Sequence, residues 1–319
     1  MADYDVFNGD ADGICSLIQL RLAEPRDAAL ITGVKRDIAL LSRLSAAPGD
    51  RITALDISMR TNGEALRRLL DQGAAVFYAD HHNAGEIPDH PALDAAIDTG
   101  SDMCTALIVS DRLSGAYERW ALAAAFGDGL AHVASARARS AGLTEAEIET
   151  LARLGTLLNY NGYGASVGDL HFPPDALYGH AAPFACPFAF IAERPDIYAR
   201  LDAGYREDMD AAEGAAVIDE TPRTFVIELP DAAASRRVSG VFGNRLAETV
   251  PGRAHAILTA SPGGYVVSVR APHERREGAD TLCLQFESGG GRAGAAGINH
   301  LPRTDLDRFV AAFRTAFGG

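Results

Sequence analysis

Five short apolar segments alternate with segments of helical pattern in the N-terminal third of the chain. The apolar segments are residues 4–7, 28–34, 51–55, 76–79 and 93–97. Continuous apolar runs of this length are typical of strands buried on both faces, and strands that alternate with helices form mostly parallel sheets. The sequence therefore predicts an α/β protein whose N-terminal domain is built on a parallel sheet.

Acidic and imidazole side chains follow these predicted strands. They are Asp10, Asp12, Asp56, Asp80, His81, His82 and Asp98. Ligands of open parallel sheets bind at the carboxyl ends of the strands, so we expect these side chains to share one edge of the sheet. Several acidic groups in one crevice repel each other unless cations neutralise them. A centre with more than one metal ion is the leading hypothesis.

The turn after the first strand, residues 8–13, places Asn8, Asp10 and Asp12 at alternate positions. Alternate side chains of an extended turn can point the same way, as ligands of one metal must. Asp also favours helix N-termini, so a helix cap is the alternative for one of them. Asp128, between two glycines in an apolar run, is likewise either a ligand or the end of a helix.

Three helix starts are predicted in the same domain. Lys35 and Arg36 follow the second strand, where they can reach an anion, although a solvated helix start is the favoured interpretation. Ser101 is the predicted N-cap of the helix after the fifth strand. Thr144 and Glu147 have the spacing of a capping box.

The remaining sequence predicts a second, smaller α/β domain. We assign residues 1–195 to the first domain, 196–220 to a helical linker and 221–319 to the second domain. The second domain has predicted strands at 225–229, 254–258 and 265–269 and predicted helices at 234–248 and 281–286.

Residues 289–297 contain five glycines in nine positions, which is too many for a packed element. Such a backbone can approach a ligand closely and offer its N–H groups to phosphate oxygens, with a flexible loop as the alternative. Arg270, at the end of the adjacent strand, favours an anion, because a guanidinium matches phosphate geometry. The candidate substrate-binding residues are Arg270, Gly289, Gly290, Gly291 and Arg292.

The net charge of −14 argues against a protein that coats long nucleic acid, which requires a broad basic surface. No apolar run is long enough to cross a bilayer, and the N-terminus lacks the layout of a signal peptide, so we expect a cytoplasmic protein without a membrane partner. The four cysteines lie far apart in apolar sequence, which predicts reduced core residues and neither disulfides nor a zinc site.

Taken together, these motifs resemble the DHH phosphoesterase superfamily with a C-terminal DHHA1 domain. The superfamily includes RecJ-type exonucleases, nanoRNA and cyclic-dinucleotide phosphodiesterases and, more distantly, family II inorganic pyrophosphatases and exopolyphosphatases. The matching segments follow the family order: residues 8–13, 55–56, 80–82 and 123–128, then 243–248, 268–270 and 289–297.

The resemblance implies two manganese ions, with Mg²⁺ or Co²⁺ as substitutes. The implied ligands are Asp10, Asp12, Asp56, His81 and Asp128, with Asp56 bridging the ions and Asn8 as a further candidate from the same motif. Asp80 and His82 are the implied catalytic residues, with His82 touching the scissile phosphate. Arg270 and the glycine-rich segment with Arg292 would hold the rest of the substrate. The implied chemistry is two-metal-ion hydrolysis of a phosphoester.

Three positions depart from the family motifs. Val6 stands where many relatives have His, and Asn8 stands where RecJ-type members have Asp. The first metal ion would therefore be held more weakly. Arg292 replaces the His of the usual Gly-Gly-Gly-His motif, which keeps a positive charge but removes a group able to exchange protons near neutral pH.

The expected function is manganese-dependent hydrolysis of phosphodiester bonds in short RNA or DNA oligonucleotides or small nucleotides, with the cleavage polarity open. One alternative is a phosphoanhydride hydrolase of the pyrophosphatase or exopolyphosphatase kind, which the single lysine disfavours. Another is a nucleotide-binding protein with weak or lost catalysis, suggested by the three departures. A homodimer is a candidate assembly.

Overall fold

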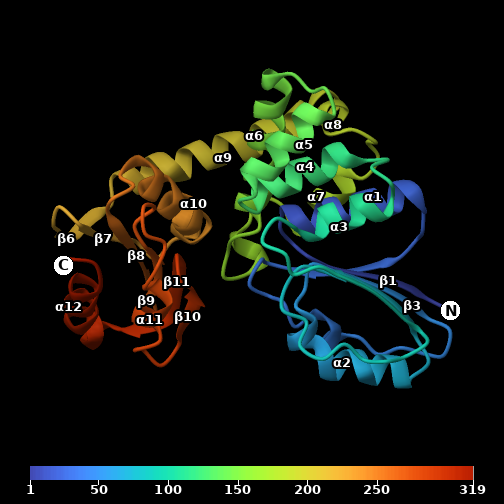
Figure 1. Cartoon of the computed structure of the whole chain (residues 1–319), viewed down its shortest axis with the longest axis horizontal. Coiled ribbons are helices and arrows are strands. Elements are labelled where there is room, and N and C mark those ends of the chain that lie inside the picture. Colours follow the sequence, from blue (N-terminus) through green and yellow to red (C-terminus); the bar gives the residue numbers. More distant parts are fainter. Residues whose placement is uncertain (319) are drawn as a thin grey trace. The chain divides into compact units, whose positions relative to one another are not determined.

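The computed structural model describes residues 1–318 and divides the chain into two compact units (Figure 1). The first unit is Met1–Gly204, and the second begins at Tyr205. The division falls inside the helix α9 (Pro195–Glu213), which contributes residues to both units.

The first unit contains a five-stranded sheet in the order β2-β1-β3-β4-β5, and every neighbouring pair is parallel. The strands are β1 (Asp3–Asn8), β2 (Ala29–Gly33), β3 (Arg51–Leu55), β4 (Ala75–Asp80) and β5 (Leu93–Ile97). The predicted parallel α/β domain is confirmed. The register aligns Phe7 with Leu55 and Leu55 with Ala79, so these three strands end side by side.

Helices cover both faces of this sheet (Figure 1). The helix α2 lies on one face together with the short 3₁₀ helix η1, and α1, α3 and α4 lie on the opposite side. The helices are α1 (Ala11–Ala23), η1 (Leu40–Arg43), α2 (Met59–Asp71), α3 (Thr105–Arg112), α4 (Glu118–Gly127), α5 (Ala131–Ser140), α6 (Glu145–Asn161), η2 (Val167–Asp169), α7 (Pro174–Ala181) and α8 (Pro187–Glu193), with the N-terminal part of α9.

Two of the three predicted helix starts differ from the structure. The segment after Lys35 forms only the short 3₁₀ helix η1, in which Leu40 and Leu41 are buried. Ser101 is not a cap, because α3 begins at Thr105 and its first free N–H groups bind Asp12 of the distant α1. The third start is confirmed, since Thr144 and Glu147 cap α6 reciprocally.

The helices α4 and α6 pack with their backbones in contact at two glycines. A Cβ atom on Gly155 would overlap the carbonyl oxygen of Ala123, and one on Gly127 would lie 2.7 Å from the carbonyl oxygen of Gly155. Backbone atoms cannot move aside as a flexible side chain can. The close approach of α4 to α6 therefore requires glycine at both positions.

We expect Gly155→Ala to lower the free energy of unfolding of the first unit by about 2–3 kcal/mol, as overpacking does. Fluorescence of Trp120, the only tryptophan, reports urea unfolding of this unit. Gly179→Ala in α7 is the matched control, because nothing lies within 4 Å of its added Cβ. The control should gain about 0.5–1 kcal/mol from helix propensity. Equal effects of the two substitutions would contradict the packing argument.

The second unit contains a six-stranded mixed sheet in the order β10-β11-β9-β8-β7-β6. Only β7 and β8 pair in parallel. The elements are β6 (Ala216–Glu220), β7 (Thr224–Leu229), α10 (Ala233–Thr249), β8 (Ala254–Ser261), β9 (Gly264–Arg270), α11 (Ala279–Cys283), β10 (Gly289–Arg292), β11 (Ala295–Pro302), η3 (Arg303–Asp305) and α12 (Leu306–Phe317).

Two predictions for the second unit are wrong in detail. The glycine-rich segment is no loop, because Gly289–Arg292 pairs antiparallel with Ala295–Pro302 as a β-hairpin. The region 196–220 is not helical throughout, since residues Ala216–Glu220 form β6 and pair with β7. Backbone hydrogen bonds to neighbouring strands stabilise both strands, and composition does not report such pairing.

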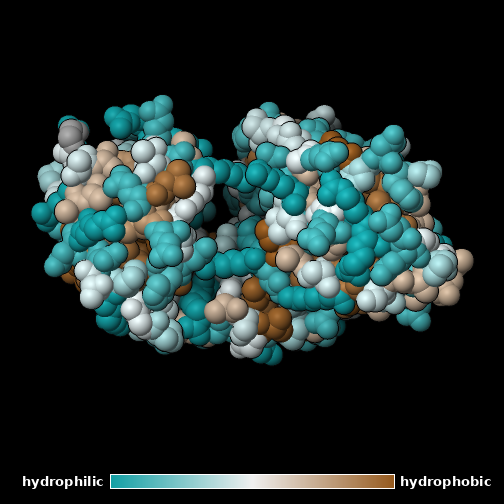
Figure 2. All heavy atoms as spheres, turned by 90° about the horizontal axis from the view of Figure 1, so that it is seen from below, coloured by the Kyte–Doolittle hydropathy of each residue, from teal (hydrophilic) through white to brown (hydrophobic). Residues whose placement is uncertain are grey.

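The structure has free cysteines, as the sequence predicts, and a largely hydrophilic face (Figure 2). No helix within residues 1–318 is both long enough and apolar enough to cross a membrane. The face shown in Figure 2 is largely hydrophilic, with hydrophobic residues scattered over it. All four cysteines are free; Cys15, Cys104 and Cys283 are buried and Cys186 is half-buried.

His255 in β8 is a buried residue whose titration bears on stability. Its side chain is 1% exposed, and its Nδ1 atom has no hydrogen-bond partner among the described residues. The ring packs edge-on against Phe225, with 6.1 Å between the ring centroids. Burial, with a further contribution from the charge of Arg253, lowers the pKa of His255 to about 4.

We expect this histidine to make the second unit sensitive to acid. Below pH 6.5 the unfolded chain binds a proton that the folded chain binds only near pH 4. Stability is therefore lost as the pH falls through this window, by about 3 kcal/mol. His255→Leu should reduce the loss of hydrogen-exchange protection in β8 between pH 7 and pH 4.5. Identical losses in both proteins would show that His255 does not titrate in this way.

Candidate metal centre

The turn between β1 and α1 places Asp10 at the N-cap of α1. Its Oδ1 atom accepts hydrogen bonds from the backbone N–H of Asp12 at 3.0 Å and of Gly13 at 3.2 Å. Asp10 is therefore a helix cap, as the alternative interpretation predicted. Capping uses one of its two carboxylate oxygens. The turn is close-packed, because a Cβ on Gly9 would lie 2.6 Å from the side chain of Pro174.

Asp12, in the first turn of α1, is buried and caps a second helix. Its Oδ2 accepts from the N–H of Thr105 at 2.8 Å and its Oδ1 from the N–H of Ala106 at 2.7 Å. These are the first residues of α3. The two bonds fix the carboxylate at the carboxyl edge of the sheet, where it can also contact a cation.

Asp56 directly follows β3 and has a left-handed backbone with φ of 56°. Non-glycine residues seldom adopt this conformation, and those that do concentrate at functional sites. Its backbone N–H donates to Ala79 in β4 at 3.1 Å, and its Oδ1 accepts from the hydroxyl of Thr105 at 3.2 Å. The turn of the backbone directs the carboxylate toward Thr105 at the start of α3.

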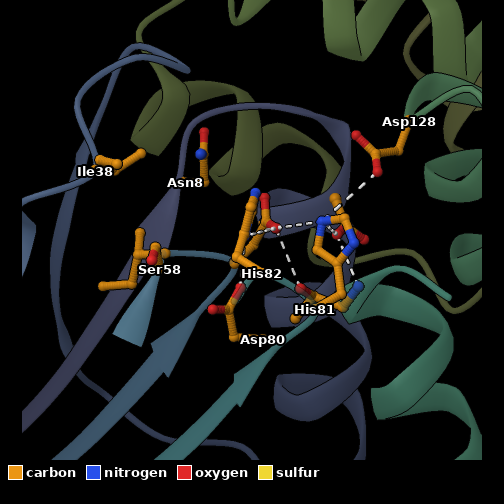
Figure 3. Close-up of polar contacts among 12 residues, drawn as sticks. Asn8, Ile38, Ser58, Asp80, His81, His82 and Asp128 are labelled. Atoms are coloured by element: carbon orange, nitrogen blue, oxygen red, sulfur yellow. Dashed lines mark hydrogen bonds and ion pairs between the residues drawn. The ribbon is translucent and has the colours of Figure 1, made fainter. Parts of the chain in front are cut away.

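His81 follows β4 and turns one ring nitrogen toward three carboxylates (Figure 3). Its Nδ1 lies 3.1 Å from the carbonyl oxygen of Met103. A carbonyl can only accept, so Nδ1 is a donor, and Nε2 is the ring nitrogen that is left to bind a metal ion. The carboxylate oxygens around Nε2 are Asp56 Oδ1 at 3.5 Å, Asp128 Oδ2 at 3.7 Å and Asp12 Oδ2 at 3.9 Å.

His82 and Asp80 form a separate hydrogen-bonded pair (Figure 3). His82 Nδ1 lies 2.7 Å from Asp80 Oδ1, and Asp80 Oδ2 accepts from the backbone N–H of Met59 at 3.3 Å. Asp80 is fully buried, whereas the side chain of His82 is 35% exposed. The hydrogen bond to Asp80 raises the pKa of His82 above its ordinary value, although partial burial opposes the shift.

Asp128 ends α4, and its side chain reaches the same centre. Its backbone N–H donates to Ala124 at 2.9 Å, as expected for a helix terminus. Its carboxylate points at His81 (Figure 3). The two interpretations of this residue, helix end and metal ligand, are therefore compatible.

The buried carboxylates of the centre favour a cation. Burial raises the pKa of Asp12 and, more strongly, that of Asp56, and the neighbouring carboxylates add to both shifts. Ionised oxygens in this place are unfavourable unless positive charge compensates them. Ligand atoms of Asp12, His81 and Asp128 lie within 4.8 Å of one another, as do those of Asp56, His81 and His82. The two triads share His81, and their residues fit a divalent cation beside it.

Lys35 also belongs to this centre, contrary to the prediction of a solvated helix start. Its Nζ forms a short ion pair with Asp10 Oδ2 and lies 2.9 Å from Asn159 Oδ1 and 3.5 Å from Asp128 Oδ1. Burial opposes the charged form, but Asp10, Tyr163 and Asp128 together outweigh burial and raise the pKa of Lys35 well above its ordinary value. The available signal was a strand-end position held by the only lysine of the chain.

Two other predicted residues lie apart from the carboxylate cluster. Asn8 donates from Nδ2 to the carbonyl oxygen of Lys35 at 3.3 Å, and its buried Oδ1 has no partner among the described residues. Asp98, although it follows β5, is exposed and accepts only from the N–H of Gly100 at 2.9 Å. The expectation that Asp98 joins the other strand-end carboxylates is wrong, because β5 is the edge strand.

The predicted substrate-binding residues all lie in the second unit. Arg270 ends β9 and pairs in register with Ala295 of the glycine hairpin. Its guanidinium donates to Asn244 Oδ1 at 2.7 Å, to Ser268 Oγ at 3.0 Å and to the carbonyl oxygen of Gly240 at 3.2 Å. Gly289, Gly290, Gly291 and Arg292 form β10, where Arg292 is exposed.

Comparison with solved structures identifies the architecture. A crystal structure of exonuclease RecJ bound to manganese matches with a TM-score of 0.61 and 19% identity, over 98% of this chain and 89% of that chain. The chain has a RecJ-like fold. A structure of RecJ with Mn²⁺ from Thermus thermophilus matches with a TM-score of 0.62 and 19% identity, over 98% of this chain and 51% of that chain.

The RecJ-like fold is also shared with a smaller protein. The pGpG-specific phosphodiesterase PggH from Vibrio cholerae matches with a TM-score of 0.56 and 17% identity, over 98% of both chains. No family model matches the sequence. No curated protein matches it at a significant level. The predicted resemblance to the DHH/DHHA1 superfamily is thus confirmed as a likeness of fold.

Proposed function

We propose that the chain is a divalent-metal-dependent phosphodiesterase that hydrolyses short oligonucleotides or small nucleotides. One observation carries the proposal: His81 directs Nε2 toward the carboxylates of Asp12, Asp56 and Asp128 at the carboxyl edge of a parallel sheet. This donor set suits manganese, which accepts imidazole and carboxylate ligands. RecJ structures with Mn²⁺ and with Mg²⁺ share the fold.

A bound divalent ion would supply electrostatic stabilisation of the charge that develops on phosphate oxygens. The residues of the chain perform the remaining tasks. His81 and the carboxylates of Asp12, Asp56 and Asp128 would hold the ion. The hydrogen bond to Asp80 raises the pKa of His82, and this partly exposed side chain can donate a proton to the leaving oxygen of the ester.

The composition and the second unit support a short substrate. The net charge of −14 disfavours a long polyanion, because binding one requires a broad basic surface. We propose that Arg270, Arg292 and the glycine hairpin Gly289–Gly291 hold the part of the substrate away from the reacting phosphate. PggH, whose length the fold matches almost completely, acts on pGpG, a dinucleotide.

The test is hydrolysis by the metal-stripped full chain, with and without added Mn²⁺. The substrates are a dinucleotide, a five-residue RNA, 3′-phosphoadenosine 5′-phosphate, a cyclic dinucleotide and pyrophosphate. His81→Ala is the variant and Asp98→Asn the matched control, because Asp98 also follows a strand but lies outside the cluster. Mn²⁺-dependent cleavage of nucleotides, lost in His81→Ala alone, is the expected result.

The other outcomes each favour a different function. Hydrolysis of pyrophosphate alone would favour a phosphoanhydride hydrolase, although the only lysine is already paired with Asp10 and Asp128. Binding of a nucleotide without turnover in any metal would favour the nucleotide-binding protein. Equal activity of His81→Ala and the wild type would overturn the proposed centre.

A further inference from the structure

A lysine stands where the family resemblance implies one of two metal ions. We propose that the Lys35 ammonium replaces that ion, so that the chain binds a single divalent cation beside a cation of its own. The inference rests on the proposed function, since it concerns the metal content of the same centre. The proposed site would bind one divalent metal ion, with the ammonium group of Lys35 supplying the second positive charge.

An ammonium group already occupies Oδ2 of Asp10, the oxygen that the helix cap leaves free. The Oδ1 of Asp10 accepts from the N–H groups of Asp12 and Gly13 at the start of α1. Its Oδ2 forms the short ion pair with Lys35. A metal ion that used Asp10 would have to displace either the helix cap or the ammonium.

Among the described residues, few uncommitted donor atoms lie beside Lys35, and the buried Oδ1 of Asn8 is one of them. Val6, where many members of the resembled family have His, is apolar and fully buried in the sheet. Asn8 turns its Nδ2 to the carbonyl oxygen of Lys35. The remaining oxygens near Lys35, from Asp128 and Asn159, already face its Nζ. A divalent ion that needs four to six ligand atoms finds too few here.

The fold fixes Lys35 in this place. Its backbone N–H donates to the carbonyl oxygen of Gly162 at 2.8 Å, just after α6, and its own carbonyl accepts from Asn8. The Nζ also lies 5.6 Å from the ring centroid of Tyr163. The side chain is 24% exposed. The ammonium is therefore held by β1, α1, α4 and α6 together.

On the other side of the centre, the donors for one ion are complete. Asp12, His81 and Asp128 converge within 4.8 Å, and Asp56 Oδ1 lies 3.5 Å from His81 Nε2. Asp128 lies between His81 and Lys35, with Oδ2 toward His81 and Oδ1 toward Lys35. This arrangement pairs one divalent ion with one ammonium across a shared carboxylate.

The experiment counts Mn²⁺ ions on the metal-stripped full chain. Native mass spectrometry gives the stoichiometry, and electron paramagnetic resonance distinguishes an isolated Mn²⁺ ion from a spin-coupled pair. We expect one uncoupled ion per wild-type chain. Lys35→Ala removes the ammonium and frees oxygens of Asp10, Asp128 and Asn159, so we expect a second, more weakly bound ion and a coupled spectrum.

Two further variants keep the test decisive. Lys35→Met retains the length of the side chain without its charge and replaces Lys35→Ala if that protein does not fold. Arg36→Ala removes an adjacent, exposed positive charge and should leave one uncoupled ion. A wild-type chain that binds two coupled ions would overturn the inference, and so would a Lys35 variant that still binds only one.

Failure of this inference is distinguishable from failure of the proposed function. Two ions with hydrolysis of nucleotides would overturn only the role of Lys35. One ion without hydrolysis of any substrate would leave Lys35 as proposed and overturn the enzyme. No bound Mn²⁺ at all would overturn both.

Discussion

Asp56→Asn is expected to lower kcat/KM for Mn²⁺-dependent hydrolysis about 1,000-fold and to raise the melting temperature of the metal-stripped protein. The loss of activity follows because Asn offers a neutral amide oxygen where the carboxylate would hold and neutralise the ion. The backbone should not change, because Asn adopts the left-handed conformation found at Asp56, with φ of 56°, more readily than most residues.

The gain in stability follows from the raised pKa of Asp56. Burial, then the charges of Asp12, Asp10 and Asp128, raise this pKa well above its ordinary value. A carboxyl whose folded-state pKa is raised stabilises the protein at low pH, and this contribution is lost as the pH rises and the group must ionise. At neutral pH the metal-free wild type is therefore destabilised by the ionisation of Asp56, whereas Asp56→Asn is not. Added Mn²⁺ should reverse the order, because binding stabilises only the protein that holds the ion.

The measurements are steady-state kinetics and thermal unfolding, each with EDTA and with excess Mn²⁺. Asp98→Asn is the matched control, since it makes the same chemical change at another strand end and should alter neither quantity. Asp56→Ala also removes the charge, but Ala does not favour a positive φ. Comparison with Asp56→Asn therefore separates the effect of the charge from the effect of the backbone conformation. Retained activity in Asp56→Asn would exclude Asp56 as a ligand.

The position of the cluster could be predicted because it depends on a regular feature of the fold. A parallel sheet ends its central strands at one edge, so Asp56 after β3 and His81 after β4 had to be neighbours. The sequence could not indicate Asp98 as the exception, because which strand lies at the edge depends on the strand order. The roles of the clustered residues as ligands stay predictions until metal binding is measured.

Lys35 could not be predicted because its partners are distant in sequence. Asp128 lies 93 residues and Asn159 lies 124 residues further along the chain. Hydrophobic periodicity and capping signals describe neighbours within a few residues, so they favoured solvent for a charged residue after a strand. The contact arises only when α4 and α6 pack over the carboxyl edge of the sheet.

The glycine-rich segment shows that composition alone can give the wrong secondary structure. Glycine is unfavourable in strands, so residues 289–297 favoured a loop. In the structure, Gly289 packs against the backbone of Cys283, where a Cβ would overlap the carbonyl oxygen, and Gly291 has φ of 142°. The glycines permit the close approach of the hairpin to α11. Pairing with β11 compensates the low strand propensity.

Asp80→Asn is expected to lower kcat about 100-fold with little change in KM, and to shift the alkaline limb of the pH–rate profile to lower pH. His82 donates a hydrogen bond to Asp80, and this bond raises the pKa of His82 above its ordinary value of 6.5 although partial burial opposes the shift. An amide in place of the carboxylate still accepts the hydrogen bond of Nδ1 but removes the charge that favours the protonated ring. The pKa of His82 then falls, and the proton donor is lost at a lower pH.

A double-mutant cycle distinguishes this positioning role of Asp80 from simple damage to a buried site. In the His82→Gln background the imidazole is absent, so Asp80→Asn should cause no further loss of kcat and no shift of the pH profile. A full additional loss in that background would mean that Asp80 acts independently of His82, for instance through the N–H of Met59 that its Oδ2 accepts. Asp80 is fully buried, so its substitution could disturb the neighbouring metal centre. The number of Mn²⁺ ions bound per chain is therefore measured for each variant. An unchanged metal content with a shifted alkaline limb would then locate the defect in the proton held by His82.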